Sequence, residues 1–321
     1  MELRQLRYFV RIVELGSVSR AAKDLFIAQP ALSSQLSNLE EELGVRLLSR
    51  SVRGVKPTAA GDLLYLHAQA VLRQIDRLRH EVSGQSATAG GPVSIGLPTS
   101  AANVLAGPLI GAVQARYPDV KLQIVESLSG HLEELVATGR LEMSLLFVDV
   151  TDTALKGRDK NRLGHLQWTP LLDEELFLLS RPDETSGEHS SISLEQASHL
   201  RFVLPGKGNM TRQLIDQAFE SAGLKLDVLA ELDSLSTIQS VIESGLGATI
   251  LSRSALLGHQ ESDRLIARSI SGVTLKRRIS LCTSDIMALG AAAECVIALL
   301  PPLVHQLIDE GQWAGATAIS K

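Results

Sequence analysis

Three short amphipathic helices before Gly44 constrain the fold of this chain more than any other feature of its sequence. Apolar residues recur every three or four positions from Leu3 to Val13, and this spacing predicts a buried helical face that ends at Gly16. Ser17 can cap a second helix, and a third is predicted to begin at Gln29-Pro30, where proline in the first turn costs no hydrogen bond. The third helix is expected to bury Leu32, Leu36, Leu39 and Leu43. Because the last two helices are only a few residues apart, the pattern predicts a helix-turn-helix.

The next segment is predicted to be a basic hairpin followed by a long helix. Residues 45–57 contain two β-prone arms around Arg53-Gly54, so we expect a small wing that carries Arg46, Arg50, Arg53 and Lys56. Thr58 can cap a helix of about 25 residues, which spans about 37 Å. The apolar positions of this helix alternate in steps of four and three residues, as in helices that pair with one another. We therefore expect a dimerisation helix with contacts at Leu64, Ala68, Val71, Ile75 and Leu78.

The remainder of the chain is predicted to be an α/β domain. Residues 83–92 contain three glycines and no large apolar residue, which is typical of a linker. Beyond the linker, short apolar strands alternate with amphipathic helices, an order that predicts a parallel sheet. We expect strands at 93–97, 120–125, 143–148, 176–179, 201–204, 228–231, 248–251 and 278–282. Helices are expected at 104–116, 132–138, 211–222, 235–244 and from Gly290, the last of them disturbed at Pro301-Pro302.

These elements divide the chain into three regions. We expect a winged helix-turn-helix at 1–58, a linker and dimerisation helix with a hinge at 59–91, and a regulatory domain at 92–321. The fold class is α/β with an all-α N-terminal winged helix-turn-helix.

Charge and composition narrow the class of protein further. Residues 1–57 carry nine Lys and Arg against six Asp and Glu, a net charge of +3, which leaves −8 on the rest of the chain. A basic N-terminal region on an acidic body is typical of a protein that contacts phosphates at one end. Two cysteines and eight scattered histidines indicate neither a disulfide framework nor a metal site. The chain opens directly into an amphipathic pattern without a secretory signal or a membrane-length apolar run, so we expect a cytoplasmic protein.

The outer face of the third helix carries hydrogen-bonding side chains opposite the leucines. Glutamine can bond adenine bidentately in the major groove, and serine can bond base edges or phosphates. A solvated polar face is the alternative, but the position of this helix before an arginine-bearing wing favours binding to double-stranded DNA. The expected DNA contacts are Gln29, Pro30, Ser33, Ser34, Ser37, Arg50 and Arg53.

The N-terminal motifs resemble the signature of LysR-type transcriptional regulators over roughly the first 65 residues. They are Leu6-Arg-Tyr-Phe9, Gly16-Ser17, Ala21-Ala22, Gln29-Pro-Ala-Leu-Ser33, Leu39-Glu40, Leu43-Gly44, Leu47-Leu48-x-Arg50 and Pro57-Thr58-x-Ala60-Gly61. Residues 27–33, Arg53-Gly-Val and Tyr65-x-His67-Ala68 are similar to the branch that contains the nitrogen assimilation control protein. Many members of the family have serine where this chain has Ala28, so a cap or phosphate contact is expected to be absent there.

The resemblance implies a regulatory domain of two subdomains like those of periplasmic binding proteins, about 92–162 with 267–300, and 163–266, which hold a ligand between them. In this sequence, polar residues follow two strands and open two helices, so hydroxyls and N–H groups converge at one sheet edge. The arrangement suits a small organic anion, whereas helix capping is the alternative role of each serine. The expected effector contacts are Thr99, Ser100, Ala101, Ser127, Ser129, Phe202 and Val203, with the loop 206–209 closing over them.

Enzymatic alternatives have little support in the sequence. No nucleophile elbow, phosphate-binding loop or dinucleotide fingerprint is present, and Glu133-Glu134 and Asp173-Glu174-Glu175 are interpreted as solvated charge runs. A small-molecule binding protein or enzyme with an N-terminal oligomerisation module remains the second hypothesis, and a redox sensor using Cys282 and Cys295 the third. The favoured interpretation is a LysR-type regulator without cofactor or metal, a dimer of dimers that binds promoter DNA and a small effector. RNA polymerase is a further candidate partner, and no membrane is expected.

Overall fold

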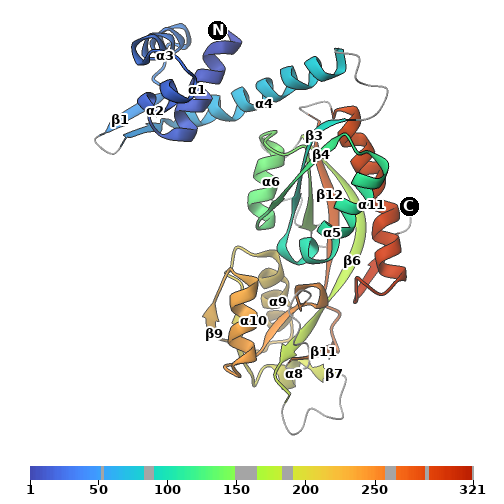
Figure 1. Ribbon diagram of the computed structural model, residues 1–321. Coiled ribbons are helices and arrows are strands. Elements are labelled where there is room, and N and C mark those ends of the chain that lie inside the picture. Colours follow the sequence, from blue (N-terminus) through green and yellow to red (C-terminus); the bar gives the residue numbers. More distant parts are fainter. Residues whose placement is uncertain are drawn as a thin grey trace. The chain divides into compact units, whose positions relative to one another are not determined.

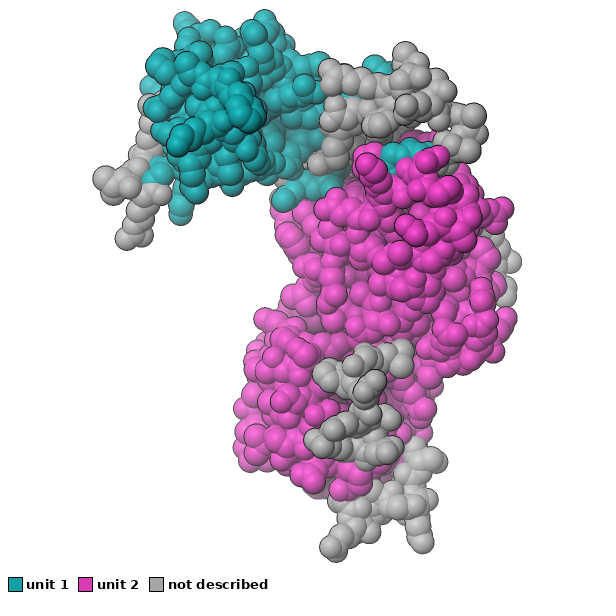
Figure 2. All heavy atoms as spheres, in the orientation of Figure 1, with its two compact units in different colours: residues 1–91, 138–140, 286–288 teal, residues 92–137, 141–285, 289–321 magenta. Residues whose placement is uncertain are grey.

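The computed structural model describes residues 1–51, 54–82, 90–148, 165–182, 191–256, 265–285 and 289–319. They form two compact units, which Figure 1 shows as ribbons and Figure 2 in two colours. The first unit consists mainly of Met1–Gly91, and the second of Pro92–Ala137, Leu141–Asp285 and Leu289–Lys321. Each unit has a hydrophobic core of its own, as expected of a separate domain.

Three helices build the helix-turn-helix of the first unit: α1 (Leu3–Leu15), α2 (Val18–Asp24) and α3 (Gln29–Leu43). The Ser17 hydroxyl caps α2 by accepting the Arg20 backbone N–H, as predicted. Of the four leucines expected inside, Leu32, Leu36 and Leu39 are buried. Leu43 is exposed, so that prediction was wrong: this residue ends α3, whereas the core lies against the earlier turns of the helix.

The predicted wing is an antiparallel hairpin of β1 (Leu48–Ser51) and β2 (Gly54–Pro57), and α4 (Ala59–Val82) follows it. Thr58 caps α4, because its hydroxyl oxygen accepts the Gly61 N–H at 3.1 Å, and it also donates to the Arg46 carbonyl at 2.7 Å. Glycine is needed at position 61, since a Cβ there would lie 2.0 Å from the Leu47 carbonyl oxygen. The start of α4 is therefore packed closely against the base of the wing.

The second unit consists of two lobes joined by long strands. The first lobe contains β3 (Gly91–Leu97), α5 (Thr99–Arg116), β4 (Val120–Glu126), α6 (Ser129–Ala137), β5 (Met143–Val148), α11 (Ala291–Asp309) and β13 (Ala316–Ala318). The second lobe contains β7 (Ser191–Ser193), α8 (Leu194–Ala197), β8 (Arg201–Leu204), α9 (Met210–Ser221), β9 (Asp227–Glu231), α10 (Leu235–Glu243), β10 (Thr249–Ser252), the 3-10 helix η2 (Arg253–Leu256) and β11 (Ile266–Ser271). Figure 1 shows β6 (Leu166–Ser180) and β12 (Lys276–Ser284) running from one lobe towards the other.

The main sheet has the strand order β4-β3-β5-β12-β6-β11-β7, with β10 and β13 also paired to β6. The predicted parallel pairing holds for β3 with β5 and for β8 with β9. It was wrong for β12, which is antiparallel to both β5 and β6, and for β10 and β11, which are antiparallel to β6. The reason is that β6 carries the chain into the second lobe and β11 and β12 bring it back. Only the end of β6 was predicted from the sequence, because Gln167, Thr169 and Pro170 interrupt the apolar pattern of its first half.

The core of the first lobe is formed by β3, β5, α5 and α11. The last helix, predicted to be disturbed at Pro301-Pro302, continues through both prolines as α11, although neither of them can donate a backbone hydrogen bond. Its buried residues Val296, Leu300 and Val304 lie on both sides of the prolines, so core packing holds the helix in place. By length and composition α11 is apolar enough to cross a membrane, but its buried face belongs to this core.

Candidate functional site

The outer face of α3 is exposed, as the sequence predicted. Gln29, Pro30, Ser34 and Ser37 are exposed and Ser33 is half-buried, on the side opposite the buried leucines. Gln29 accepts a 2.9 Å hydrogen bond at Oε1 from the Ser19 hydroxyl on α2, which leaves the amide N–H groups of Gln29 directed elsewhere. Ala28 is the N-cap of α3 and provides no side-chain cap, so the first turn of this helix keeps N–H groups for an external acceptor.

The wing is attached to α3 through Glu40, a contact that the sequence analysis missed. One carboxylate oxygen of Glu40 accepts the backbone N–H groups of Leu47 and Leu48 at 2.7 and 3.1 Å. Arg50 lies in β1 opposite Val55, whereas Arg53 lies outside the described residues. The wing is therefore held in a fixed position relative to the exposed face of α3.

The apolar stripe of α4 has two parts. Ala68 is buried against Leu6 and Val10 of α1 within the same chain, with Leu64 packed at the edge of this cluster. Further along, Ile75 is half-buried, and Val71 and Leu78 are 43% and 52% exposed. The second part of the predicted stripe thus presents apolar side chains that the single chain leaves largely uncovered.

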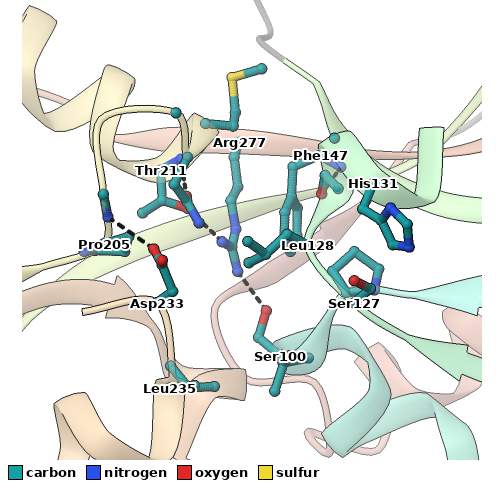
Figure 3. Close-up of a pocket in the computed structure, with 18 of the residues that line it drawn as sticks. Ser100, Ser127, Leu128, His131, Phe147, Pro205, Thr211, Asp233, Leu235 and Arg277 are labelled. Atoms are coloured by element: carbon teal, nitrogen blue, oxygen red, sulfur yellow. Dashed lines mark hydrogen bonds between the residues drawn. The ribbon is translucent and has the colours of Figure 1, made fainter. Parts of the chain in front are cut away.

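A cleft of about 500 Å³ opens between the two lobes of the second unit (Figure 3). Four of the predicted effector residues line it: Thr99, Ser100, Ser127 and Ser129. Three others do not, since Ala101, Phe202 and Val203 are each fully buried in hydrophobic cores. Met210 and Thr211, at the start of α9, together with Asp233, contribute the wall from the second lobe instead.

The start of α5 lacks a side-chain cap and lies at the cleft. Its N-cap is Pro98, which makes no side-chain cap, so Ser100 does not cap this helix. Ser100 is 6% exposed, and its oxygen accepts a 2.9 Å hydrogen bond from Arg277. Ser129, at the start of α6, accepts the Phe147 backbone N–H at 3.4 Å. Uncapped N–H groups, the buried Ser100 hydroxyl and the half-buried Ser129 hydroxyl therefore meet in the first-lobe wall of the cleft.

Arg277 on β12, a residue that was not predicted from the sequence, joins the two lobes at the centre of the cleft. Figure 3 shows its guanidinium between Ser100 of the first lobe and Thr211 of the second, the latter at 2.7 Å. The same guanidinium donates to Ser252 at 2.8 Å and lies 3.6 Å from the Phe147 ring centroid. Its charge is compensated by Glu174 on β6, whose carboxylate accepts at 2.9 and 2.7 Å.

Glu174 is fully buried, so its interpretation as part of a solvated run was wrong. It accepts hydrogen bonds from Ser254 and from the Trp313 indole N–H as well as from Arg277. The available signal was the apolar surroundings of each charge, since Glu174 shares a register of β6 with the buried Leu172, Leu176 and Leu178, and Arg277 shares one of β12 with the buried Ile279 and Leu281. Opposite charges among buried residues of two paired strands predict a buried ion pair.

The second-lobe wall is fixed by another buried arginine. Arg212 on α9 donates to the Pro205 carbonyl at 3.3 Å and forms ion pairs with Asp216 and Glu231 at 2.7 and 2.9 Å. The N-terminus of α9 is capped by Asn209, whose side chain accepts the Thr211 N–H.

The described residues contain no group of three His, Cys, Asp or Glu side chains that could hold a metal ion.

A winged helix-turn-helix followed by a two-lobed domain with a central cleft defines a transcriptional regulator. The model described as "Bacterial regulatory helix-turn-helix protein, lysR family" matches residues 3–62, and "LysR substrate binding domain" matches residues 86–303. The chain therefore belongs to the LysR family of transcriptional regulators, with a DNA-binding helix-turn-helix and an effector-binding domain. It is not an enzyme, and the hypothesis of an N-terminal module that only oligomerises the chain is not favoured.

The relatives place the chain near one branch of this family, as predicted. It is 34% identical to the nitrogen assimilation regulatory protein nac of Klebsiella aerogenes, over 95% of this chain and 96% of that protein. The corresponding protein of Escherichia coli (strain K12) is 35% identical over 79% of each chain. A full-length OxyR variant from Pseudomonas aeruginosa has a TM-score of 0.72 at 23% identity, and the match covers 100% of this chain and 99% of that one. Full-length CbnR complexed with its target DNA has a TM-score of 0.66 at 18% identity, over 96% and 98%. These two structures share the fold.

Proposed function

We propose that this regulator reads a promoter sequence with the exposed face of α3 and responds to a small organic anion bound in the cleft between its lobes. In this proposal Gln29, Pro30, Ser33, Ser34 and Ser37 contact base edges or phosphates. Arg50 and Arg53 of the wing contact the DNA backbone or a minor groove. The uncapped start of α3 can accept a phosphate in place of a capping side chain.

The observation that carries the effector proposal is the first-lobe wall of the cleft. There α5 begins without a side-chain cap, next to the buried Ser100 hydroxyl and beside Thr99, Ser127 and Ser129. A helix N-terminus attracts negative charge, and its unpaired N–H groups need an acceptor when water is displaced. A carboxylate at this position satisfies both requirements.

We further propose the regions 1–58, 59–91 and 92–321 as the DNA-binding, linker and effector-binding domains. The largely exposed Val71 and Leu78 on α4 support a dimer formed through this helix, and two dimers on an imperfect palindrome make a tetramer. Action on promoters implies a cytoplasmic protein. Effector binding then alters DNA bending or contact with RNA polymerase.

A paired assay on Ser100→Ala tests the proposal. A reporter assay measures the transcriptional response to metabolites of the neighbouring genes, and a gel-shift measures promoter binding by the same protein. We expect the response to be lost while binding without effector persists. Ser280→Ala is the matched control, because Ser280 is also buried but does not line the cleft. A Ser100→Ala protein that responds at the wild-type effector concentration would contradict the proposal.

A further inference from the structure

The charges that line the cleft do not match those of a simple anion site. Apart from the imidazole of His131, the ionisable side chains in its described lining are Arg277, Glu133 and Asp233. Arg277 is the one Lys or Arg among these lining residues, and its charge is compensated by the buried Glu174 at 2.7 Å. The charges of Arg277 and Glu174 cancel, so Asp233 gives the cleft an excess of negative charge even when Glu133 is not counted. This excess opposes the binding of a ligand that carries only a carboxylate.

Arg277 nevertheless prepares two donors for a carboxylate. The oxygens of Ser100 and Thr211 accept hydrogen bonds from the guanidinium at 2.9 and 2.7 Å. Within the described part of the chain neither hydroxyl donates a hydrogen bond to another residue, so both hydrogens remain for a ligand acceptor. Together with the uncapped start of α5, they form a site that requires acceptor oxygens. Arg277 is thus a positioning residue, and the hydroxyls it orients are the ligand contacts.

Asp233 supplies the complementary charge from the second lobe. Its Oδ1 accepts the Gly206 N–H at 3.4 Å, which fixes the carboxylate at the cleft, and Oδ2 has no hydrogen bond among the described residues. The Asp233 side chain is exposed, so its charge costs little desolvation before a ligand arrives. An ammonium group is the partner that such oxygens favour.

We propose, building on the proposed function, that the carboxylate bound in the cleft belongs to an amino carboxylate with an apolar body. Its carboxylate binds at Ser100, Thr211 and the start of α5, and its ammonium group faces Asp233 across the cleft. Apolar side chains of the lining, among them Leu128, Met210 and Leu235, surround the body between the two charges. A cleft of about 500 Å³ accommodates a ligand of this size. The two charges of the ligand then match both the donor-rich wall and the acidic excess.

Binding of three matched probe sets to the full-length protein tests this inference. The sets are small carboxylates, the same molecules with an added primary amine, and the amines without the carboxylate, each measured by titration calorimetry. We expect the amino carboxylate to bind at least about tenfold more tightly than its parent carboxylate, because it alone gains an opposite charge at Asp233. Asp233→Asn, which keeps the oxygen that holds Gly206, should remove this preference. Asp227→Asn on β9 is the control, because Asp227 is exposed and does not line the cleft.

The outcomes separate the inference from the proposed function. If the parent carboxylate binds as tightly as its amino derivative, and Asp233→Asn strengthens its binding, the inference is overturned while an anionic effector stands. If only the amines bind, or no probe with a carboxylate binds to a protein that still shifts its promoter, the anionic effector itself is refuted. Loss of the preference in Asp233→Asn, with no change in Asp227→Asn, supports the inference.

Discussion

Removing the negative charge of Glu174 should destabilise the effector-binding domain strongly. In Glu174→Gln the shape of the side chain is kept, but Arg277 becomes an uncompensated cation with 4% of its side chain exposed. Both Arg277 hydrogen bonds go to Oε2 of Glu174, so a glutamine that keeps its oxygen there turns its NH2 group towards the Ser254 hydroxyl and the Trp313 indole N–H, which donate to Oε1 in the wild type. Breaking a buried ion pair by removing one partner costs about 3–5 kcal/mol, a large part of the roughly 5–15 kcal/mol that stabilises a domain.

Urea unfolding followed by tryptophan fluorescence measures this loss selectively, because both tryptophans, Trp168 and Trp313, belong to the second unit. The matched control is Asp173→Asn on the same strand, whose pair with Arg278 at 2.8 Å is partly exposed and should contribute less than about 1 kcal/mol. Replacing Glu174 and Arg277 together by leucine and methionine should cost less than Glu174→Leu alone. If Glu174→Gln lowers the unfolding free energy no more than Asp173→Asn does, the Arg277–Glu174 ion pair does not stabilise the effector-binding domain.

Further predictions concern the first unit. Gln29→Ala should lose about 1–3 kcal/mol of discrimination between the cognate site and random DNA, and unchanged footprint protection would remove α3 from base contact. Alanine at both Arg50 and Arg53 should weaken binding to all sequences and flatten the dependence of log affinity on log salt, and a wild-type slope would exclude them from the interface. Leu78→Asp should weaken dimers, whereas an unchanged sedimentation coefficient would show that the exposed stripe of α4 is not an interface. The Arg11 guanidinium donates two 2.6 Å hydrogen bonds to Asp24 and lowers the pKa of that carboxyl below its usual 3.8. The resulting stability is present above pH 3.8 and is lost as the pH falls through the lowered pKa. Asp24→Asn should therefore reduce the loss of unfolding free energy with falling pH in this range. An unchanged pH dependence of the unfolding free energy would contradict a stabilising Arg11–Asp24 ion pair.

Local signals in the sequence predicted most of the first unit, because the apolar positions of its helices are regularly spaced and Ser17 and Thr58 cap the helices that follow them. Thr58 illustrates this, since a helix cap depends on one residue type, whereas the close backbone approach at Gly61 was not predicted. The burial of Leu43 was predicted wrongly, because helical periodicity does not indicate where along α3 the hydrophobic core ends.

The cleft was predicted only in part. Ser100 and Ser129 were found because they follow strands and open helices, whereas Phe202 and Val203 were misplaced since strand ends can face either the cleft or the core. Arg277 and Glu174 lie 103 residues apart and meet only through the antiparallel pairing of β12 with β6, which the alternation of strands and helices did not predict.

Quantitative footprinting of the promoter, with and without the effector, tests the central claim most directly. The measurement compares wild-type protein with Ser100→Ala on the same DNA fragment. We predict that effector changes the extent or the hypersensitive positions of the wild-type footprint, and that Ser100→Ala gives the effector-free footprint under both conditions. A wild-type footprint that no effector alters, or a Ser100→Ala footprint that changes as the wild type does, would contradict the account.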